Sequence, residues 1–346
     1  MRKTKVIVVD GSKFIRTLFS SLLNEASDIE VIETASDPYE AGDKIKQLAP
    51  DAILLSIDLP KMDGISFLDK IMTHHPMPVI MISSLTHEAA DITLKALELG
   101  AVDYITKPLE ARLFTDLDGL RVELAAKVRN AVGANLKSMH LKAISKNPLE
   151  FTPSTNTKHK VIAIGASTGG VEAIRQVMLE LPANIPPVVI TQHMPEKYTE
   201  AFAKRLDNLT KVKVHEARNG QKLNVGNVYV APGGKQMSIT GDRASGYTIK
   251  IDDGEPVAGY KPSIDHLFES IAKTCGSDAI GVILTGNGDD GAEGMLKMKK
   301  SGAFNIGQSK DSCVVYEMPK AANENQSVDI ELPLQGIAAE VLKHCV

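Results

Sequence analysis

Residues 161–181 read VIAIGASTGGVEAIRQVMLEL: an apolar run, a glycine-rich turn and a stretch with apolar residues at helical spacing. A short β-branched run that ends at a turn predicts a buried strand, and the amphipathic stretch after it predicts a helix. A strand followed directly by a helix is the repeating unit of parallel α/β sheets. The turn at Gly165–Gly170 also contains the pattern G-x-S-x-G. The stretch therefore predicts an α/β domain with a serine at the end of one strand.

The strand–helix alternation extends over most of the chain. In the first half, strands are predicted at 6–9, 30–33, 52–55, 79–82 and 103–106. Helices are predicted between them at 13–24, 39–48, 66–73, 88–99 and 113–132. In the second half, strands are predicted at 161–164, 187–191, 212–215, 228–230, 279–284 and 304–307. The helices there are at 171–181, 198–206, 265–274, 292–300 and 337–344. This pattern predicts two α/β domains, each with a doubly wound parallel sheet.

The pattern fails between residues 133 and 160. Asn147-Pro148 and the polar run 152–157 are typical of turns and linkers. We therefore predict a first domain at 1–125, a helical extension and linker at 126–158, and a second domain at 159–346.

Composition excludes several classes of protein. A chain of 346 residues predicts about two domains, and its net charge of -4 excludes a nucleic-acid binder that relies on bulk charge. No window approaches the ~20 apolar residues of a membrane span, and the apolar run before Asp10 is too short for a signal peptide. Three cysteines stand far apart without metal-ligand spacing, at positions 275, 313 and 345. We expect a cytoplasmic protein without disulfides, without membrane insertion and without a nucleic-acid partner.

Three predicted strands of the second half end in residues that can carry out nucleophilic chemistry. Ser167 follows the strand at 161–164, His193 follows the strand at 187–191, and Asp289 and Asp290 follow the strand at 279–284. The carboxyl ends of parallel strands share one rim of the sheet, which is where sites form. Ser, His and Asp on one rim would form a nucleophile, its base and an orienting carboxylate. The glycine-rich motif by itself also fits a plain tight turn or a dinucleotide-binding loop.

Six ordered sequence blocks resemble chemotaxis protein-glutamate methylesterases, the CheB family. These blocks are Gly165–Gly170, Gln192–Met194, Val230–Gly234, Lys261–Asp265, Thr285–Gly291, and Ser312–Val315 followed by Met318–Lys320. The first half resembles the receiver domain that precedes the esterase in that family. The resemblance implies a flavodoxin-like receiver and a three-layer α/β/α methylesterase domain. It also implies hydrolysis of γ-glutamyl methyl esters on methyl-accepting chemoreceptors, with release of methanol, and deamidation of certain receptor glutamines.

Carried over residue by residue, the resemblance makes Ser167 the nucleophile, His193 the general base and then acid, and Asp290 the orienting carboxylate. The oxyanion donors would be the backbone N–H groups of Thr168 and Asn287. Asp289 stands where the family often has Asn, and its charge would either raise the basicity of His193 or face solvent. The implied chemistry needs no cofactor and no metal.

The receiver half departs from the family pattern at its phosphorylation pocket. Receivers carry two acids after the first strand and a phosphoacceptor Asp after the third. Here Asp10 is followed by Gly11, and Ser56 stands at the acceptor position. Asp58, two residues beyond, is a poor substitute. These departures predict a pseudo-receiver that does not form an aspartyl phosphate.

Other receiver signatures remain in this half. The resemblance identifies Ser83 and Tyr104 as the switch pair and Lys107 as the residue that would bind phosphoryl oxygens. A retained domain of this kind predicts contacts with chemotaxis signalling proteins.

Two alternatives belong to other classes of protein. One is an NAD(P)-binding reductase, for which Tyr316 and Lys320 have the Tyr-x-x-x-Lys spacing. Pro319 between them argues against the helix that this motif needs. The other is a receptor-binding scaffold without catalysis, against which the intact set of Ser167, His193 and Asp290 argues.

Overall fold

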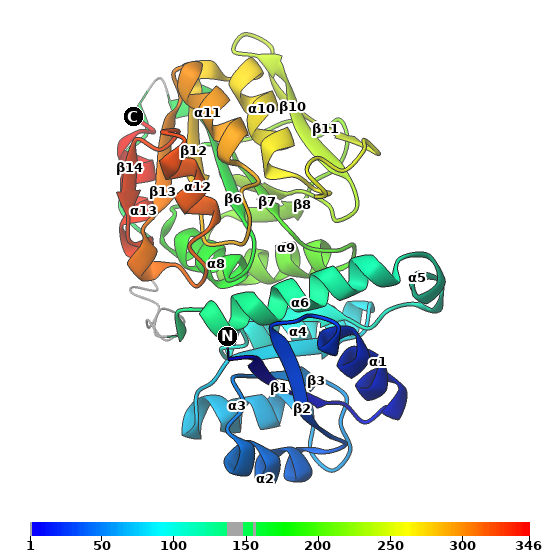
Figure 1. Cartoon of the computed structure of the whole chain (residues 1–346). Helices are drawn as coiled ribbons and strands as arrows, with labels where there is room; N and C mark the ends of the chain where they lie inside the picture. Colours follow the sequence, from blue (N-terminus) through cyan, green and yellow to red (C-terminus); the bar gives the residue numbers. More distant parts are fainter. Residues whose placement is uncertain (1, 137–147, 155–156) are drawn as a thin grey trace. The chain divides into compact units, whose positions relative to one another are not determined.

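The computed structural model describes residues 2–136, 148–154 and 157–346, and the chain divides into two compact units, 1–140 and 141–346 (Figure 1). Much of the predicted linker at 126–158 lies outside the described residues. No helix in the described ranges is both long and apolar enough to cross a membrane.

The first unit is built on a five-stranded parallel sheet. Its strands are β1 (Thr4–Val9), β2 (Ile29–Ala35), β3 (Ala52–Ser56), β4 (Val79–Ser83) and β5 (Asp103–Thr106). They lie in the order β2-β1-β3-β4-β5, and every neighbouring pair is parallel. This is the flavodoxin-like order, in which the strand order reverses beside β1. The expected fold class of this unit is confirmed.

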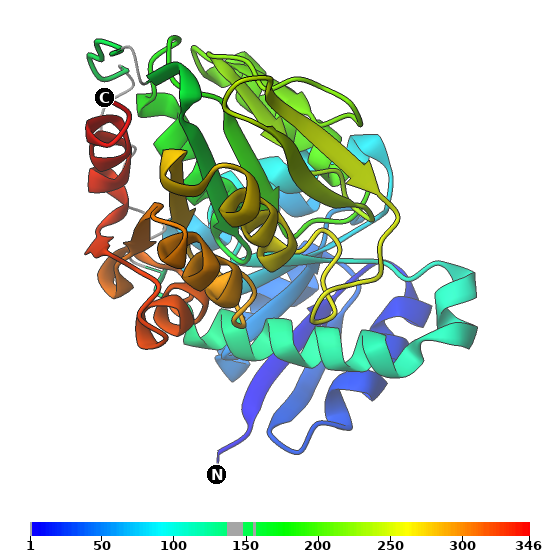
Figure 2. The same ribbon diagram turned by 90° about the horizontal axis from the view of Figure 1, so that it is seen from above.

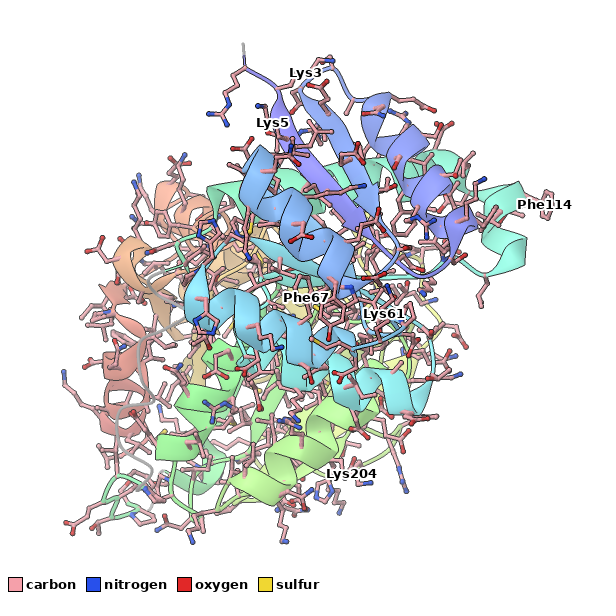
Figure 3. All side chains as sticks on the ribbon, turned by 90° about the horizontal axis from the view of Figure 1, so that it is seen from below. Lys3, Lys5, Lys61, Phe67, Phe114 and Lys204 are labelled. Carbon is pink, nitrogen blue, oxygen red and sulfur yellow. The ribbon has the colours of Figure 1, made fainter. Side chains whose placement is uncertain are left out.

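The helices of the first unit follow its strands as predicted, with one exception. They are α1 (Lys13–Asn24), α2 (Pro38–Leu48), α3 (Gly64–His74), α4 (His87–Glu98), α5 (Glu110–Thr115) and α6 (Leu117–Gly133). The single helix predicted at 113–132 is wrong, because the chain leaves helical geometry at Asp116. Its carboxylate accepts a hydrogen bond from Gly119 N–H at 3.0 Å and caps α6. Phe114 on α5 is 89% exposed and points into solvent (Figure 3).

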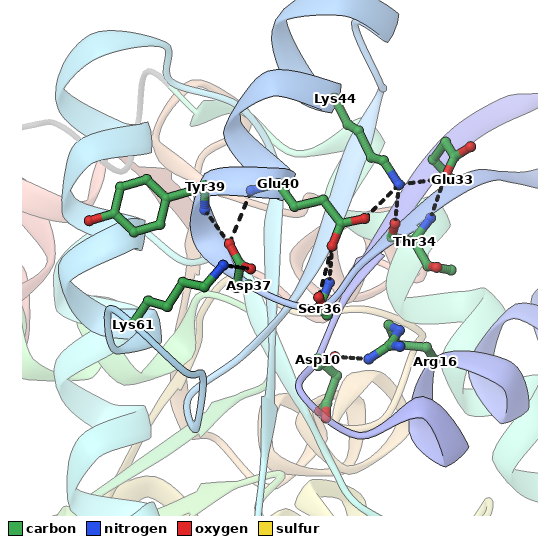
Figure 4. A network of polar contacts seen from close by, with 10 residues as sticks. All are labelled: Asp10, Arg16, Glu33, Thr34, Ser36, Asp37, Tyr39, Glu40, Lys44 and Lys61. Atoms are coloured by element: carbon green, nitrogen blue, oxygen red, sulfur yellow. Dashed lines mark hydrogen bonds and ion pairs between the residues drawn. The ribbon is translucent and has the colours of Figure 1, made fainter.

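A network of charged side chains surrounds the start of α2 (Figure 4). Asp37 caps this helix by accepting from the backbone N–H groups of its first turn, and Lys61 pairs with the same carboxylate. Glu40 accepts from Ser36, and Lys44 bridges Glu40 to a carboxylate on β2. The network holds the loop after β2 against the helix that follows it.

The second unit is built on a seven-stranded parallel sheet. Its strands are β6 (Val161–Ala166), β7 (Val188–Gln192), β8 (Lys213–Glu216), β9 (Asn227–Val230), β12 (Ala279–Ile283), β13 (Phe304–Gln308) and β14 (Ile330–Leu332). They lie in the order β14-β13-β12-β6-β7-β9-β8. The chain builds outward from β6 through β7 on one side and then adds β12 on the other. The carboxyl end of β6 is therefore the switch point, where open α/β sheets form their sites.

The helices of the second unit are α8 (Gly170–Glu180), α9 (Tyr198–Leu209), α10 (Ile264–Thr274), α11 (Ala292–Lys300), α12 (Met318–Glu324) and α13 (Leu334–Lys343). The sequence analysis missed α12, the strand β14 and an antiparallel hairpin of β10 (Gln236–Asp242) and β11 (Gly246–Asp252). The hairpin lies beside α10 (Figures 1 and 2), where Ile239 N–H donates to Ser270 Oγ at 2.9 Å. Buried Met237 and Ile249 join the hairpin to the core of the unit.

Candidate active site

Ser167 lies one residue beyond β6, on the turn that leads into α8. Gly169 has a φ of 78°, and a Cβ there would lie 2.7 Å from the Val314 side chain. Only glycine adopts this positive φ at low cost and also lacks the Cβ that would clash with Val314. The Ser167 N–H donates to Thr285 O at 3.1 Å, which ties the turn to the loop after β12. The local sequence thus places a half-buried serine hydroxyl at the carboxyl end of a central strand.

His193 lies beside Ser167 on the neighbouring strand end. Ala166 and Gln192 are in register across β6 and β7, and His193 N–H donates to Ala166 O at 3.2 Å. The next residues along both strands are Ser167 and His193. The buried Gln192 amide also donates to Ser167 O at 2.9 Å and to His193 O at 3.4 Å. The sheet register and one side chain therefore fix the backbones of both residues.

Asp290 is the carboxylate that contacts His193. It is 1% exposed, and its Oδ2 lies 2.8 Å from His193 Nε2. Its oxygens also accept from Ser263 Oγ at 2.8 Å and from the N–H groups of Ile264 and Asp265 at 2.7 and 3.0 Å. These donors form the N-terminus of α10, where helix geometry favours an anion.

The surroundings of Asp290 keep it ionised. Burial raises the pKa of this carboxyl, but its hydrogen bond to His193, the charge of that ring and the two backbone donors outweigh burial. The pKa of Asp290 accordingly lies below its ordinary value of 3.8. An ionised carboxylate on Nε2 can hold a proton there and leave Nδ1 of the same ring as the basic nitrogen.

The structure does not join Ser167 Oγ to His193 by a hydrogen bond. In the described part of the chain, Nδ1 of His193 is buried and has no hydrogen-bond partner. Catalytic hydrogen bonds are often open in sites without substrate and close when substrate binds. Nδ1 is the ring nitrogen available to a serine proton, because Asp290 occupies Nε2.

Tyr260 is a site residue that the sequence analysis missed. Its ring stacks on the imidazole of His193, with centroids 4.0 Å apart and planes 8° from parallel. Burial and the nearby charges of Asp290, Asp289 and Glu317 raise the pKa of its phenol, so the ring is neutral. The available signal was its position directly before the Lys261–Asp265 block.

The two predicted oxyanion donors lie on the loops that flank Ser167. Thr168 is buried at the turn into α8, and its carbonyl accepts from Thr285 Oγ1 at 3.0 Å. Asn287 lies two residues beyond Thr285, and over the described ranges its backbone N–H has no acceptor. Gly286 between them is packed so tightly that a Cβ would lie 2.8 Å from Ser167 Cβ. The loop carrying Asn287 therefore runs directly against the serine.

Asp289 faces solvent. Its side chain is exposed, and its backbone carbonyl accepts from Ala292 N–H at 3.0 Å at the start of α11. The carboxylate bound to His193 is that of Asp290. Of the two interpretations of Asp289 from sequence, the solvated one matches this geometry.

Comparison with known proteins places this arrangement in a family. Residues 162–341 match the family model of the CheB methylesterase, and residues 6–117 match that of the response regulator receiver domain. The chain belongs to the CheB methylesterase family. It is 44% identical over 342 residues to a protein-glutamate methylesterase/protein-glutamine glutaminase of Salmonella typhimurium, covering 99% of this chain and 97% of that protein. A protein of the same name from Sulfurimonas denitrificans is 45% identical over 343 residues, covering 97% of each chain.

A solved structure agrees with the family assignment of the second unit. The crystal structure of the CheB methylesterase catalytic domain from Thermotoga maritima aligns with a TM-score of 0.52 and 34% identity. The alignment covers 53% of this chain and 97% of that domain. This member of the family therefore carries the methylesterase fold together with a receiver domain.

The reductase alternative does not agree with these findings. Tyr316 lies before α12, which begins at Met318, so Tyr316 and Lys320 do not share a helix. The Tyr316 hydroxyl donates to Glu331 at 2.5 Å instead. Membership of the CheB methylesterase family excludes the reductase class for this chain.

The residues predicted for the receiver pocket include an ion pair. Asp10 is 1% exposed, and its Oδ2 lies 2.9 Å from Lys107 Nζ. Its backbone carbonyl accepts from the Arg16 guanidinium (Figure 4). Ser56 is fully buried and donates to Asp58 O at 3.3 Å, while the Asp58 side chain is exposed.

These residues do not fit a magnesium ion. Mg²⁺ requires several oxygen ligands, commonly including one or two carboxylates. Among the described residues assigned to this pocket, Asp10 is the single buried acid, and it already pairs with Lys107. In the described ranges no three His, Cys, Asp or Glu side chains are grouped to hold a metal ion.

The predicted switch residues lie on the strands next to this pocket. Ser83, at the end of β4, is 1% exposed and accepts from Thr93 Oγ1 at 2.7 Å. Tyr104 on β5 is 7% exposed, and Lys127 Nζ lies 5.4 Å from the centre of its ring. Lys107 N–H donates to Ser83 O at 2.7 Å. The sheet thus brings the retained receiver residues together on one edge.

Proposed function

We propose that this protein is a serine hydrolase that demethylates γ-glutamyl methyl esters on chemoreceptors and deamidates receptor glutamines. The observation that carries the proposal is the pairing of a buried, ionised Asp290 with His193, one strand away from Ser167. Relatives that match almost the whole chain carry the name of that double activity. A scaffold without catalysis would have no need of this arrangement.

The proposed reaction begins at the ester carbonyl. Ser167 Oγ attacks the carbonyl carbon while its proton passes to Nδ1 of His193, and Asp290 holds the ring and stabilises the imidazolium. The negative charge that forms on the carbonyl oxygen is stabilised by the N–H groups of Thr168 and Asn287. Collapse of this intermediate breaks the bond to the methoxy group, which takes the proton from His193 and leaves as methanol.

Water completes the cycle by the reverse sequence. His193 takes a proton from water while the water oxygen attacks the acyl carbon. The bond from that carbon to Ser167 Oγ then breaks, Oγ takes the proton back from His193, and the glutamate is released. A glutamine side chain would follow the same steps, with ammonia as the leaving group. The ester and the amide share the planar carbonyl, so one site serves both.

The test is release of methanol from a methylated chemoreceptor. We expect Ser167→Ala to reduce the rate by about four to six orders of magnitude, as other serine triads do when the nucleophile is removed. Ser312→Ala, a buried serine of another loop, serves as the control and should retain most activity if it folds. Methanol release by Ser167→Ala at a near wild-type rate would refute the proposal.

We further propose that the first unit is a pseudo-receiver with a docking or fixed inhibitory role. The absence of an acid at positions 11 and 56 supports this, since neither a phosphoacceptor nor a metal site can form without them. We also propose a cytoplasmic location. The proposed domain limits are 1–125 for the pseudo-receiver, 126–158 for the helical extension and linker, and 159–346 for the methylesterase domain. The partners would be methyl-accepting chemoreceptors and chemotaxis signalling proteins.

A further inference from the structure

The stacked ring of Tyr260 has a physical role that the proposed reaction leaves unexplained. Two neutral aromatic rings gain little from lying face to face, and they prefer offset or edge-to-face arrangements. A cation above the face of a tyrosine ring is attracted by the negative charge of that face. The nearly parallel stack at 4.0 Å places the His193 imidazole over that face, where an imidazolium would be attracted.

The loop holds Tyr260 firmly against His193. Val257 and Tyr260 exchange two backbone hydrogen bonds of 3.1 and 2.9 Å across a tight turn. Both central residues of this turn, Ala258 and Gly259, have positive φ, as a type I′ turn requires. The buried Gln236 amide donates to Tyr260 O at 3.1 Å. Three hydrogen bonds thus hold the Tyr260 backbone that carries the ring.

The hydroxyl end of the Tyr260 ring lies against the Thr285–Gly291 loop. A Cβ on Gly288 would lie 3.0 Å from the Tyr260 hydroxyl. Acidic groups lie near the stacked pair: Asp290 contacts the His193 ring, and the charges of Asp289 and Glu317 act on Tyr260. An imidazolium at this position would face both the Tyr260 ring and the Asp290 carboxylate.

We propose that Tyr260 is a positioning residue for His193, which fixes the plane of the imidazole and stabilises the imidazolium formed during the reaction. This inference rests on the proposed function, because it concerns the same base. Stabilisation that appears only when the ring is charged lowers the barrier more than it strengthens substrate binding. The effect should therefore appear in kcat and in the pH profile, and little in KM.

The experiment compares Tyr260→Phe, which keeps the aromatic face, with Tyr260→Leu, which removes it. We expect the Phe variant to stay within about threefold of wild type and the Leu variant to lose about tenfold or more in kcat. In the Leu variant, the acidic limb of the kcat/KM profile should move to lower pH by about half to one unit, because the imidazolium loses a stabilising face.

A titration without substrate separates this inference from the proposed function. The imidazole signal of His193 is followed by NMR in the Ser167→Ala background, and it is assigned by its absence from His193→Gln. We expect the same downward shift for Leu and none for Phe, whatever the natural substrate is. If Tyr260→Leu does not fold, Tyr260→Met is read in the same way.

Two results would overturn the inference. One is a Leu variant whose kcat and His193 titration equal those of wild type. The other is a Phe variant as impaired as Leu, which would assign the effect to the hydroxyl instead of the ring. Suppose that the His193 titration shifts in Tyr260→Leu but the wild-type protein has no chemoreceptor esterase activity. The positioning role of Tyr260 would then hold, and the proposed substrate would be refuted.

Discussion

Asp289 and Asp290 are adjacent in the sequence but have different surroundings. Asp290 accepts four hydrogen bonds, one of them from His193, whereas Asp289 extends into solvent. We predict that Asp290→Asn lowers kcat/KM for methanol release by about 10³ to 10⁴, because an amide holds the wrong tautomer of the base. Asp289→Asn serves as the matched control and should stay within about threefold. The opposite ranking would mean that Asp289 orients His193.

Sequence alone could predict the three residues of the proposed triad but not all of their surroundings. Ser167, His193 and Asp290 each follow a predicted strand, and parallel strands end on one rim, so their meeting could be predicted. Tyr260 could not, because its position depends on a turn with two positive φ values in a region without clear periodicity. Which ring nitrogen binds Asp290 depends on side-chain rotation, which no sequence pattern encodes.

At the scale of elements, α10 and α11 cap each other. Asp290 lies just before α11 and accepts from the first N–H groups of α10. Asp265, in the first turn of α10, accepts from Gly294 N–H of α11 at 2.6 Å. Gly291, the residue directly before α11, offers no side-chain cap of its own. The two helices therefore hold the Asp290 carboxylate between their N-termini.

This arrangement predicts a pH-dependent stability. Burial raises the pKa of Asp265 to about 6, against the lowering effect of its bond from Gly294, and the charge of Asp290 adds to the rise. The folded protein thus binds this proton more tightly than the unfolded chain does. Its stabilising contribution is complete below the ordinary pKa of 3.8 and is lost as pH rises through about 6.

Asp265→Asn tests the linkage, because the amide keeps an acceptor oxygen for Gly294 but does not ionise. Relative to wild type, we expect the variant to gain about 1 kcal/mol in the free energy of unfolding between pH 4 and pH 7, allowing for the partial exposure of Asp265. Urea unfolding at both pH values measures it. Asp242→Asn, on the exposed turn of the hairpin, serves as the control. A difference between Asp265→Asn and wild type that does not change with pH would contradict the raised pKa.

The elements missed from sequence have local causes. The strands β10 and β11 alternate apolar and polar residues, but the turn between them is three residues, Arg243–Ser245, and lacks the Asn-Gly signal of a two-residue hairpin. The break between α5 and α6 depends on Asp116 acting as a cap, and the same residue is tolerated within a helix. Both outcomes depend on hydrogen bonds that periodicity does not report.

At the scale of the whole molecule, the first unit keeps the receiver fold with an altered pocket. We predict that a small-molecule phosphodonor with Mg²⁺ leaves the protein unlabelled and its esterase rate unchanged. Ser56→Asp alone should restore little labelling, because Gly11 still leaves the metal site short of a ligand. The double variant with Gly11→Asp should recover labelling, since a Cβ at position 11 meets its nearest neighbour, Pro60, at an ordinary 3.4 Å.

The outcome that contradicts this prediction is specific. Acid-labile phosphate on the unmodified protein, mapped to Asp58 or Asp10 and accompanied by a change in esterase rate, would make the first unit a working receiver. Phosphate on the double variant alone, mapped to position 56, would agree with the loss of two acids from one pocket.

The most direct test of the central claim is covalent labelling of the nucleophile. The protein is treated with a fluorophosphonate, the adduct is mapped by peptide mass spectrometry, and methanol release is measured on the same sample. We predict one adduct, on Ser167, whose yield matches the loss of activity, with slow labelling of Asp290→Asn and none of Ser167→Ala. Full esterase activity in protein whose Ser167 is completely modified, or inactivation by an adduct on another serine, would contradict the account.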